Sequence, residues 1–415
     1  MFCAKRVLSV VLSIALVLLA FSLQAAQLTI SKSGEVGLSP DRLKRINELI
    51  QRRIDAGEIS GAVTLVARRG RVVHLEPQGL ADIDSKKPMT RDTVFQIASM
   101  TKPVTGVAIM MLVEEGKVRL TDPVWRYIPE LRGLKVAVPT ARDGDPGGQT
   151  PATSFSTVLA EREITVRDLL THVSGLVSGR ISTGEAAKLP PPPSEPLSTY
   201  IPRLAAVPLE FQPGSQWGYS SMGFDTLARI VEVVSGQTFD QFLQGRIFGP
   251  LGMKDTSFNV PTGSASRRAT TYDRRDGRLQ ARIIPCCRVA GSGGLFSTAE
   301  DYWVLAQLLA NGGEFAGRRL LGPRTVDLMA APHAPDTLPG RYGPGQAFGL
   351  SMRVVTDRVK AVSPISDGSF GWNGATGTYF WVDPKEKIVA ILMVQTPIPE
   401  LQRDLEQAVM QAVIE

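Results

Sequence analysis

Cysteine and histidine are scarce in this chain of 415 residues, which contains three of each. Cys286 and Cys287 are neighbours, and a disulfide between adjacent residues is strained and rare, so we expect two free thiols or one intermolecular bond. No Cys-x-x-Cys or His-x-x-x-His spacing occurs. The sequence therefore gives no support for a metal site, and it calls for no cofactor.

Two further absences restrict the function. The chain has no Gly-x-Ser-x-Gly, the motif that places a nucleophile opposite a histidine base in many hydrolases. If the chain is a serine hydrolase, we expect its base to be a residue other than histidine. A dense stripe of Lys and Arg with interleaved aromatic residues is also missing, although the formal net charge is +6. Nucleic acid is therefore a poor candidate partner.

Only the N-terminus carries a long apolar run. Lys5 and Arg6 precede the apolar segment 7–21, and small residues follow at Ala25 and Ala26. This order is typical of a signal peptide over residues 1–26, which predicts a periplasmic or secreted protein. An uncleaved N-terminal anchor is the alternative, and contact with a membrane is expected only in that case. Cys3 would be lost on cleavage.

Helix and strand patterns alternate along the rest of the chain. Ser39-Pro40 begins a helix with apolar residues on one face, and Gly236 ends another. Residues 137–160 are rich in Pro, Gly, Thr and Asp, which predicts a long surface loop, and Pro190–Pro193 predicts an extended segment. The predicted helices are 39–54, 99–115, one starting at 120–124, 166–171, 224–235, 239–247, 298–311 and 400–414, and the predicted strands are 62–68, 71–75, 379–383 and 388–395.

Strands near both ends of the chain and helices in its middle suggest one arrangement. We expect the first and last parts to build a common antiparallel sheet, with a mainly helical lobe from about residue 100 to 280. The fold class is therefore α/β in the sense of α+β. No internal repeat is visible.

Ser99 and Lys102 form the only Ser-x-x-Lys in the sequence. A spacing of three places both side chains on one face of a helix. Pro103 fits the first turn of such a helix, so Ser99 is expected at its N-terminus, where the helix dipole favours an incipient alkoxide. The pattern alone is also compatible with an ordinary helix start followed by a surface lysine.

Three other stretches complete a recognisable set. They are Trp217-Gly218-Tyr219-Ser220-Ser221, the segment Leu169–Leu176 around His172, and Gly371–Gly377. Together with Ser99–Lys102, Pro250–Met253 and Gly293–Thr298, they make the chain resemble the serine β-lactamase and penicillin-binding-protein superfamily. The chain looks most similar to family VIII esterases, which are related to class C β-lactamases. The resemblance covers about residues 40 to 410.

This resemblance implies a β-lactamase/transpeptidase-like fold, with an antiparallel sheet flanked by helices and a helical lobe. It implies one hydrolase domain over 27–415, with a sheet lobe at about 40–98 and 281–415 and a helical lobe at about 99–280. Ser99 matches the nucleophile, Lys102 the adjacent lysine and Tyr219 the tyrosine of the second motif. Which of Lys102 and Tyr219 is the first base stays open.

The third motif reads Trp372-Asn373-Gly374. By the family's pattern, the backbone N–H groups of Ser99 and Ala375 would form an oxyanion hole. The same comparison assigns Trp372, Asn373, Gly374 and Ser221 to substrate binding. His172 would fix its loop as a hydrogen-bond donor and is expected to have no catalytic role.

Two departures from the β-lactamase pattern bear on the substrate. Ser221 stands where β-lactamases commonly have asparagine, and Trp372 stands where they have a lysine that attracts the substrate carboxylate. Both changes favour a carboxylesterase acting on a small neutral ester through an acyl-enzyme, with weak turnover of β-lactams as a further hypothesis. The alternatives are a β-lactamase or D,D-peptidase, and a non-catalytic binder. The natural ester and the oligomeric state stay open.

Overall fold

The structure is a computed structural model of the chain. It describes residues 28–140, 154–190, 195–259, 262–282, 288–334, 337–340 and 343–415. The predicted signal peptide, the middle of the predicted 137–160 loop, Pro191–Pro193 and the two adjacent cysteines lie outside the described residues. Among the helices that the structure does describe, none combines the length and the apolar character needed to cross a membrane.

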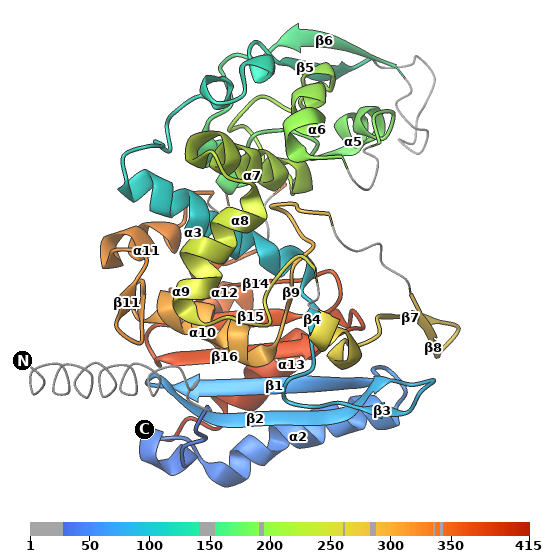
Figure 1. The fold of residues 1–415 in the computed structure, drawn as a ribbon, viewed down its shortest axis with the longest axis vertical. Coiled ribbons are helices and arrows are strands. Elements are labelled where there is room, and N and C mark those ends of the chain that lie inside the picture. The colour runs from blue at the N-terminus through green and yellow to red at the C-terminus, as the bar shows by residue number, and fades with distance from the viewer. Residues whose placement is uncertain are drawn as a thin grey trace, which may run out of the picture.

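An eight-stranded sheet forms the base of the molecule (Figure 1). All of its neighbouring strands run antiparallel. The strands, in spatial order, are β12 (Gln346–Phe348), β13 (Arg353–Val355), β14 (Phe370–Asn373), β15 (Tyr379–Asp383), β16 (Ile388–Val394), β1 (Gly61–Arg68), β2 (Arg71–Asp82) and β3 (Lys87–Pro88).

Strands from the first and last parts of the chain meet in the centre of this sheet. β1 pairs with β2 on one side and with β16 on the other, where Ala62 lies opposite Val394. Every residue of β1 and β16 is buried, so both faces of the central strands are covered. The predicted antiparallel sheet built from both ends of the chain is confirmed.

Helices cover each face of the sheet. α2 (Pro40–Asp55) and α13 (Pro399–Met410) pack together on one face, and α10 (Ala299–Ala310) packs on the other (Figure 1). Ser39 caps α2 by accepting the N–H of Arg42, as its position before Pro40 predicts. The backbone N–H of Ser39 bonds the carbonyl of Ala412, which holds the two helices side by side.

A helical region lies above α10 in Figure 1. α3 (Thr101–Glu114) is buried on all sides from Thr101 to Leu112, because it runs between the sheet side and this region. The remaining helices are α4 (Val166–Leu170), α5 (Arg180–Ala186), α6 (Leu197–Arg203), α7 (Ser221–Ser235), α8 (Phe239–Leu243), α9 (Gly249–Leu251), α11 (Pro323–Met329) and α12 (Arg358–Ala361).

Two expectations about local structure are wrong. Residues 137–160 are not wholly a loop, because β5 (Lys135–Pro139) pairs with β6 (Phe155–Leu159). The helix expected from residues 120–124 is only a 3-10 turn at Val124–Arg126, where the Asp122 carboxylate accepts bonds from the Arg119 N–H and the Tyr127 hydroxyl. These bonds fold the chain into a turn instead of starting an α-helix.

Three further short hairpins or pairings occur in the described residues. β7 (Tyr272–Arg275) pairs with β8 (Arg278–Ala281), and β10 (Glu314–Phe315) pairs with β11 (Arg318–Arg319). The third pairing matters for the site, because β4 (Phe95–Gln96) precedes Ser99 by a few residues and pairs with β9 (Phe296–Ser297). It attaches the segment before Ser99 to the segment that follows the Gly291–Gly294 stretch.

Candidate active site

Ser99 lies in a 3-10 turn, Ala98–Met100, that leads directly into α3. The backbone of Ala98 has φ of +44°, a left-handed conformation that costs free energy for any residue with a side chain. The turn is held in place because the Ile97 N–H bonds the Leu295 carbonyl at 3.0 Å, next to the β4–β9 pairing. Ser99 is half-buried, so its hydroxyl is fixed but within reach of solvent.

Lys102 is fully buried, and its amine touches Ser99. Its Nζ lies 3.1 Å from Ser99 Oγ and donates to the Ser292 carbonyl at 2.7 Å. Burial lowers the pKa of the Lys102 amine to about 7, while the negative charge of Asp225 acts in the opposite direction. The amine can therefore lose its proton near neutral pH, which an exposed lysine cannot do.

Tyr219 completes the contact from the segment that leads into α7. Its hydroxyl lies 2.7 Å from Ser99 Oγ, and the amine of Lys102 lies 4.7 Å from the centre of its ring. Partial desolvation raises the pKa of the Tyr219 phenol from its ordinary value, although the neighbouring Ser99, Ser221 and Trp372 act to lower it. The phenol therefore stays protonated at neutral pH and is available as a proton donor.

His172 holds the segment that carries Tyr219. Its carbonyl accepts the N–H of Gly218 at 2.8 Å, and its ring Nδ1 accepts the N–H of Ser220 at 3.0 Å, so it bonds both neighbours of Tyr219. The two rings pack with centroids 4.7 Å apart. Because a backbone N–H can only donate, Nδ1 is unprotonated, and burial lowers the pKa of the imidazole well below its usual value. The expected loop-fixing role fits, but the predicted direction is wrong, since this nitrogen accepts.

The segment after β14 lies against the backbone that precedes Ser99. Thr376 Oγ1 donates to the Gln96 carbonyl at 2.8 Å, and Thr378 Oγ1 donates to the Ile97 carbonyl at 3.3 Å. A Cβ on Gly374 would come within 2.4 Å of the same Ile97 carbonyl oxygen, so only glycine allows this approach. Ala375 is therefore held close to the turn that carries Ser99.

The other residues that were predicted to bind substrate do not all face the Ser99 hydroxyl. Ser221 begins α7 and lies near enough to the Tyr219 hydroxyl to lower the pKa of the phenol. Trp372 was assigned to substrate binding, but it is only 3% exposed and packs against Tyr219 at 6.0 Å between ring centres, so it supports the tyrosine and leaves little surface open to a substrate. Asn373 points to the opposite face of the sheet, where its Nδ2 reaches Gln402 of α13. The prediction for the Asn373 side chain is wrong, because successive residues of a strand face opposite sides.

Two residues that the sequence did not single out lie behind Lys102. Asp225 is buried in α7 and accepts the N–H of Ser292 at 2.9 Å, and the Ser292 carbonyl is the one that Lys102 bonds. Burial raises the pKa of the Asp225 carboxyl. A carboxylate among the apolar residues on the core face of a helix was the available signal, because such a group is seldom buried without a partner.

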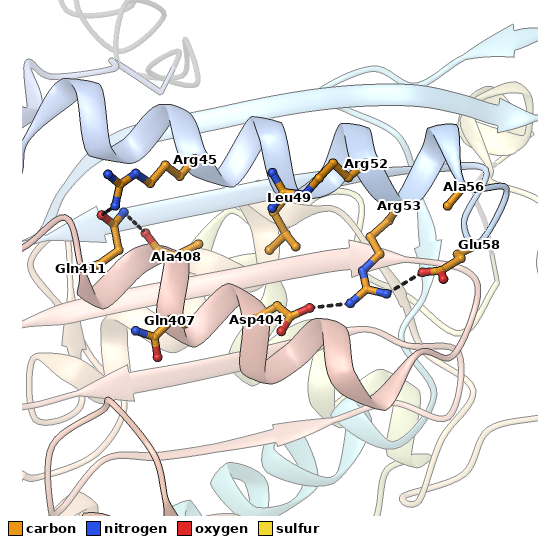
Figure 2. Close-up of a pocket in the computed structure, with 10 residues that line it drawn as sticks. All are labelled: Arg45, Leu49, Arg52, Arg53, Ala56, Glu58, Asp404, Gln407, Ala408 and Gln411. Atoms are coloured by element: carbon orange, nitrogen blue, oxygen red, sulfur yellow. Dashed lines mark hydrogen bonds and ion pairs between the residues drawn. The ribbon is translucent and has the colours of Figure 1, made fainter.

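The described residues contain no group of three or more His, Cys, Asp and Glu side chains that could hold a metal ion. One cavity of about 600 Å³ lies away from Ser99, between α2 and α13 on the opposite face of the sheet (Figure 2). Arg53 crosses it to bond Glu58 at 2.6 Å and Asp404 at 2.5 Å, and Arg45 bonds Gln411 at 2.7 Å. These contacts join the two helices and are unrelated to the Ser99 cluster.

Comparison with known proteins identifies the family of the chain. Residues 46–414 match the family model described as Beta-lactamase. The chain is 37% identical over 374 residues to the protein Rv1367c of Mycobacterium tuberculosis, covering 86% of this chain and 90% of that protein. It is 31% identical over 395 residues to the lovastatin esterase of Penicillium rubens, covering 86% and 94%. The solved structure of EstCE1, described as a hydrolase with promiscuous acyltransferase activity, superposes with a TM-score of 0.77 at 27% identity, covering 89% of this chain and 99% of EstCE1.

Proposed function

Because the chain belongs to the beta-lactamase family, we propose that it is a serine hydrolase that cleaves carboxylic esters through an acyl-enzyme on Ser99. The observation that carries this proposal is the contact of three groups, with Ser99 Oγ 3.1 Å from the Lys102 amine and 2.7 Å from the Tyr219 hydroxyl. The esterase and hydrolase names of two similar proteins support the choice of an ester.

The mechanism follows from the charge states of the three groups. The Lys102 amine, with a pKa of about 7, takes the proton of Ser99 as Oγ attacks the ester carbonyl. The backbone N–H groups of Ser99 and Ala375 stabilise the oxyanion, a contribution of about 3–4 kcal/mol for each donor. Tyr219, protonated and adjacent to Ser99 Oγ, gives its proton to the leaving alcohol, and Lys102 restores it. Water then attacks the acyl-enzyme by the same path in reverse.

Amide-bearing β-lactams are the less favoured substrates. Ser221 and Trp372 occupy positions where β-lactamases have an asparagine and a lysine, and Trp372 is buried against Tyr219 with no charge to offer. We therefore propose that esters are turned over faster than a chromogenic cephalosporin. A cephalosporin rate well above the ester rate would replace this proposal with a β-lactamase.

The direct test combines kinetics with mass spectrometry. Short-chain p-nitrophenyl esters should be hydrolysed, and a fluorophosphonate should add one adduct that peptide mapping assigns to Ser99. Ser99→Ala should lose at least about 1,000-fold in kcat/KM and take no label, with its melting temperature within a few degrees of the wild type. Retained ester turnover in Ser99→Ala would place the nucleophile elsewhere.

A further inference from the structure

Two consecutive residues, Gly291 and Ser292, join α3 to α7 through their backbone groups. The Gly291 carbonyl accepts from Thr105 Oγ1 at 2.7 Å, and the Ser292 carbonyl accepts from Lys102 Nζ at 2.7 Å, so both carbonyls bond α3. The Ser292 N–H between them donates instead to the carboxyl group of Asp225 in α7, at 2.9 Å. The carbonyl that orients the Lys102 amine is therefore held in place by Asp225.

The loop that contains this link, residues 288–294, is confined on both sides. A Cβ on Gly291 would lie 2.1 Å from the Phe224 carbonyl oxygen, so only glycine allows the loop to lie this close to α7. On the other side, a Cβ on Gly293 would lie 3.7 Å from the Ala98 carbonyl oxygen, in the turn that carries the nucleophile. The loop thus fills the space between α7 and that turn.

Asp225 and Lys102 act on each other across the Ser292 peptide. Asp225 is 2% exposed. Burial raises the pKa of its carboxyl group, while Ser292 and the positive charges of Arg288 and Lys102 act to lower it by favouring the ionised form. In turn, the negative charge of Asp225 opposes the fall in the pKa of the Lys102 amine that desolvation causes. The carboxylate is thus a counter-charge for the amine as well as an acceptor for the loop.

The other titratable groups around the amine are neutral at pH 7. Tyr219, whose ring centre lies 4.7 Å from the amine, stays a phenol because its pKa is raised, and buried His172 stays an imidazole because its pKa is lowered. The apolar ring of Phe224 lies 5.6 Å away. The guanidinium of Arg288 acts on Asp225. Within the described part of the chain, Asp225 is therefore the charge that bears on the amine.

Resting on the proposed ester hydrolysis, we propose that Asp225 is a positioning residue that acts on Lys102 in two ways. Through the Ser292 peptide it holds the amine 3.1 Å from Ser99 Oγ, and through its negative charge it keeps the amine basic enough to take the serine proton. Without this charge the amine would stay neutral to a lower pH and would be a weaker base. Asparagine separates the two effects, because it keeps an acceptor oxygen and removes the charge.

Kinetics on matched variants test both effects. In Asp225→Asn, the plateau of kcat/KM should stay within about tenfold of the wild type, while the midpoint of its acidic limb moves about one pH unit below 7. Asp225→Ala also leaves the Ser292 N–H unpaired, so its plateau should fall about 10- to 100-fold. Asp301→Asn is the control, because this buried carboxyl bonds the Asp255 N–H at 2.8 Å and the Thr256 hydroxyl at 2.9 Å. It should lower the melting temperature and leave the midpoint unchanged.

A titration without turnover separates this inference from the proposed function. In a Ser99→Ala background with lysine labelled at the ε-carbon, NMR should follow the Lys102 amine, assigned by its loss in Lys102→Met, and its midpoint should fall when Asp225→Asn is added. An unchanged midpoint in Asp225→Asn by either measurement, or a wild-type plateau in Asp225→Ala, would overturn the role of Asp225. If the NMR midpoint falls but the wild type hydrolyses no ester, the role of Asp225 stands and the esterase proposal fails.

Discussion

Lys102 is the residue on which the chemistry depends most, because burial alone makes it a usable base. Its side chain is fully enclosed, and its amine bonds Ser99 Oγ and the Ser292 carbonyl. A carbonyl favours the ammonium form, but desolvation outweighs it and lowers the pKa of the amine to about 7. Desolvation also raises the pKa of the Tyr219 phenol, although its side chain is 36% exposed, so the two groups take opposite roles.

This assignment predicts the pH dependence of kcat/KM. Lys102 must be neutral to accept the Ser99 proton, and its pKa is about 7, so the rate should rise about tenfold per unit below pH 7 and level off above it. Tyr219 stays protonated across that range. Lys102→Arg, charged at every pH, should lose about 100- to 10,000-fold. A pH profile measured with one neutral ester checks both, and a plateau that extends to pH 5 in the wild type would contradict the assignment.

His172 acts through another residue, and its geometry predicts how. Its ring accepts the Ser220 N–H from a backbone with φ of +60°, a conformation that asparagine tolerates better than most residues. His172→Asn keeps an acceptor near the Nδ1 position and should retain most of the activity. His172→Leu leaves the Ser220 N–H buried and unpaired, and should lower kcat about 10- to 100-fold.

Because His172 is a positioning residue, the pH profile distinguishes it from a base. The midpoint near pH 7 should stay in both His172 variants, since Lys102 sets it. Loss of the acidic limb in His172→Leu, or equal damage from the asparagine variant, would show that the imidazole does more than hold the Tyr219 segment.

At the scale of elements, the segment after β14 controls the distance between the oxyanion donors. Gly374→Ala would place a Cβ 2.4 Å from the Ile97 carbonyl oxygen and 2.3 Å from Thr378 Oγ1, and it should push Ala375 away from Ser99. We expect kcat to fall at least about tenfold with a small change in melting temperature. Gly184→Ala in α5 meets nothing within 4 Å and is the control, which should be active and slightly more stable. Full activity in Gly374→Ala would argue against this donor.

The elements also show what a sequence can and cannot predict. Strong local patterns correctly predicted three helix boundaries: the start of α2 from Ser39-Pro40, the end of α7 from Gly236 and the start of α10 from Thr298. The β5–β6 pairing was missed because Pro, Gly and Thr clusters hide the short alternation at Val136 and Val138. In β14 the motif was recognised, but Trp372 and Asn373 were both assigned to substrate binding. Neighbouring residues of a strand face opposite sides, so the two side chains cannot share one site.

At the scale of the molecule, local sequence patterns could not predict the parts of the site that depend on contacts between segments far apart in the chain. Ser99, Lys102 and Tyr219 were found because their motifs survive in the sequence. Asp225 and Ser292 were not, because only folding brings α7 and the 288–294 loop behind Lys102. The buried surroundings of Trp372 are likewise produced by Tyr219 and Phe348, from separate parts of the chain.

At the scale of the molecule, the segment at residues 36–37 contacts the one at 414–415, which predicts that the described part of the chain tolerates circular permutation. The buried guanidinium of Arg68 donates to the carbonyls of Val36 and Gly37, and to that of Glu415 at 2.6 Å, and the Ile414 N–H bonds the Gly37 carbonyl at 3.0 Å. A linker of about six Gly and Ser residues from Glu415 to Lys32, in a chain that starts at the new termini, can therefore join two segments that lie close together. New termini in the exposed Asp276–Gly277 turn between β7 and β8 leave the main sheet and the Ser99 cluster uncut.

This permutant should unfold cooperatively within a few degrees of the parent and keep kcat/KM within about threefold. A second permutant, with the same linker but opened between Gly374 and Ala375, should fold and lose activity, because the segment that carries the oxyanion donor is freed from the Gln96 and Ile97 carbonyls. Thermal denaturation and ester kinetics on both proteins check the prediction. Failure of the first permutant to fold would contradict the prediction. It would mean that the contacts around Arg68 and the pairing of β1 with β16 form only when the segments keep their native order in the chain.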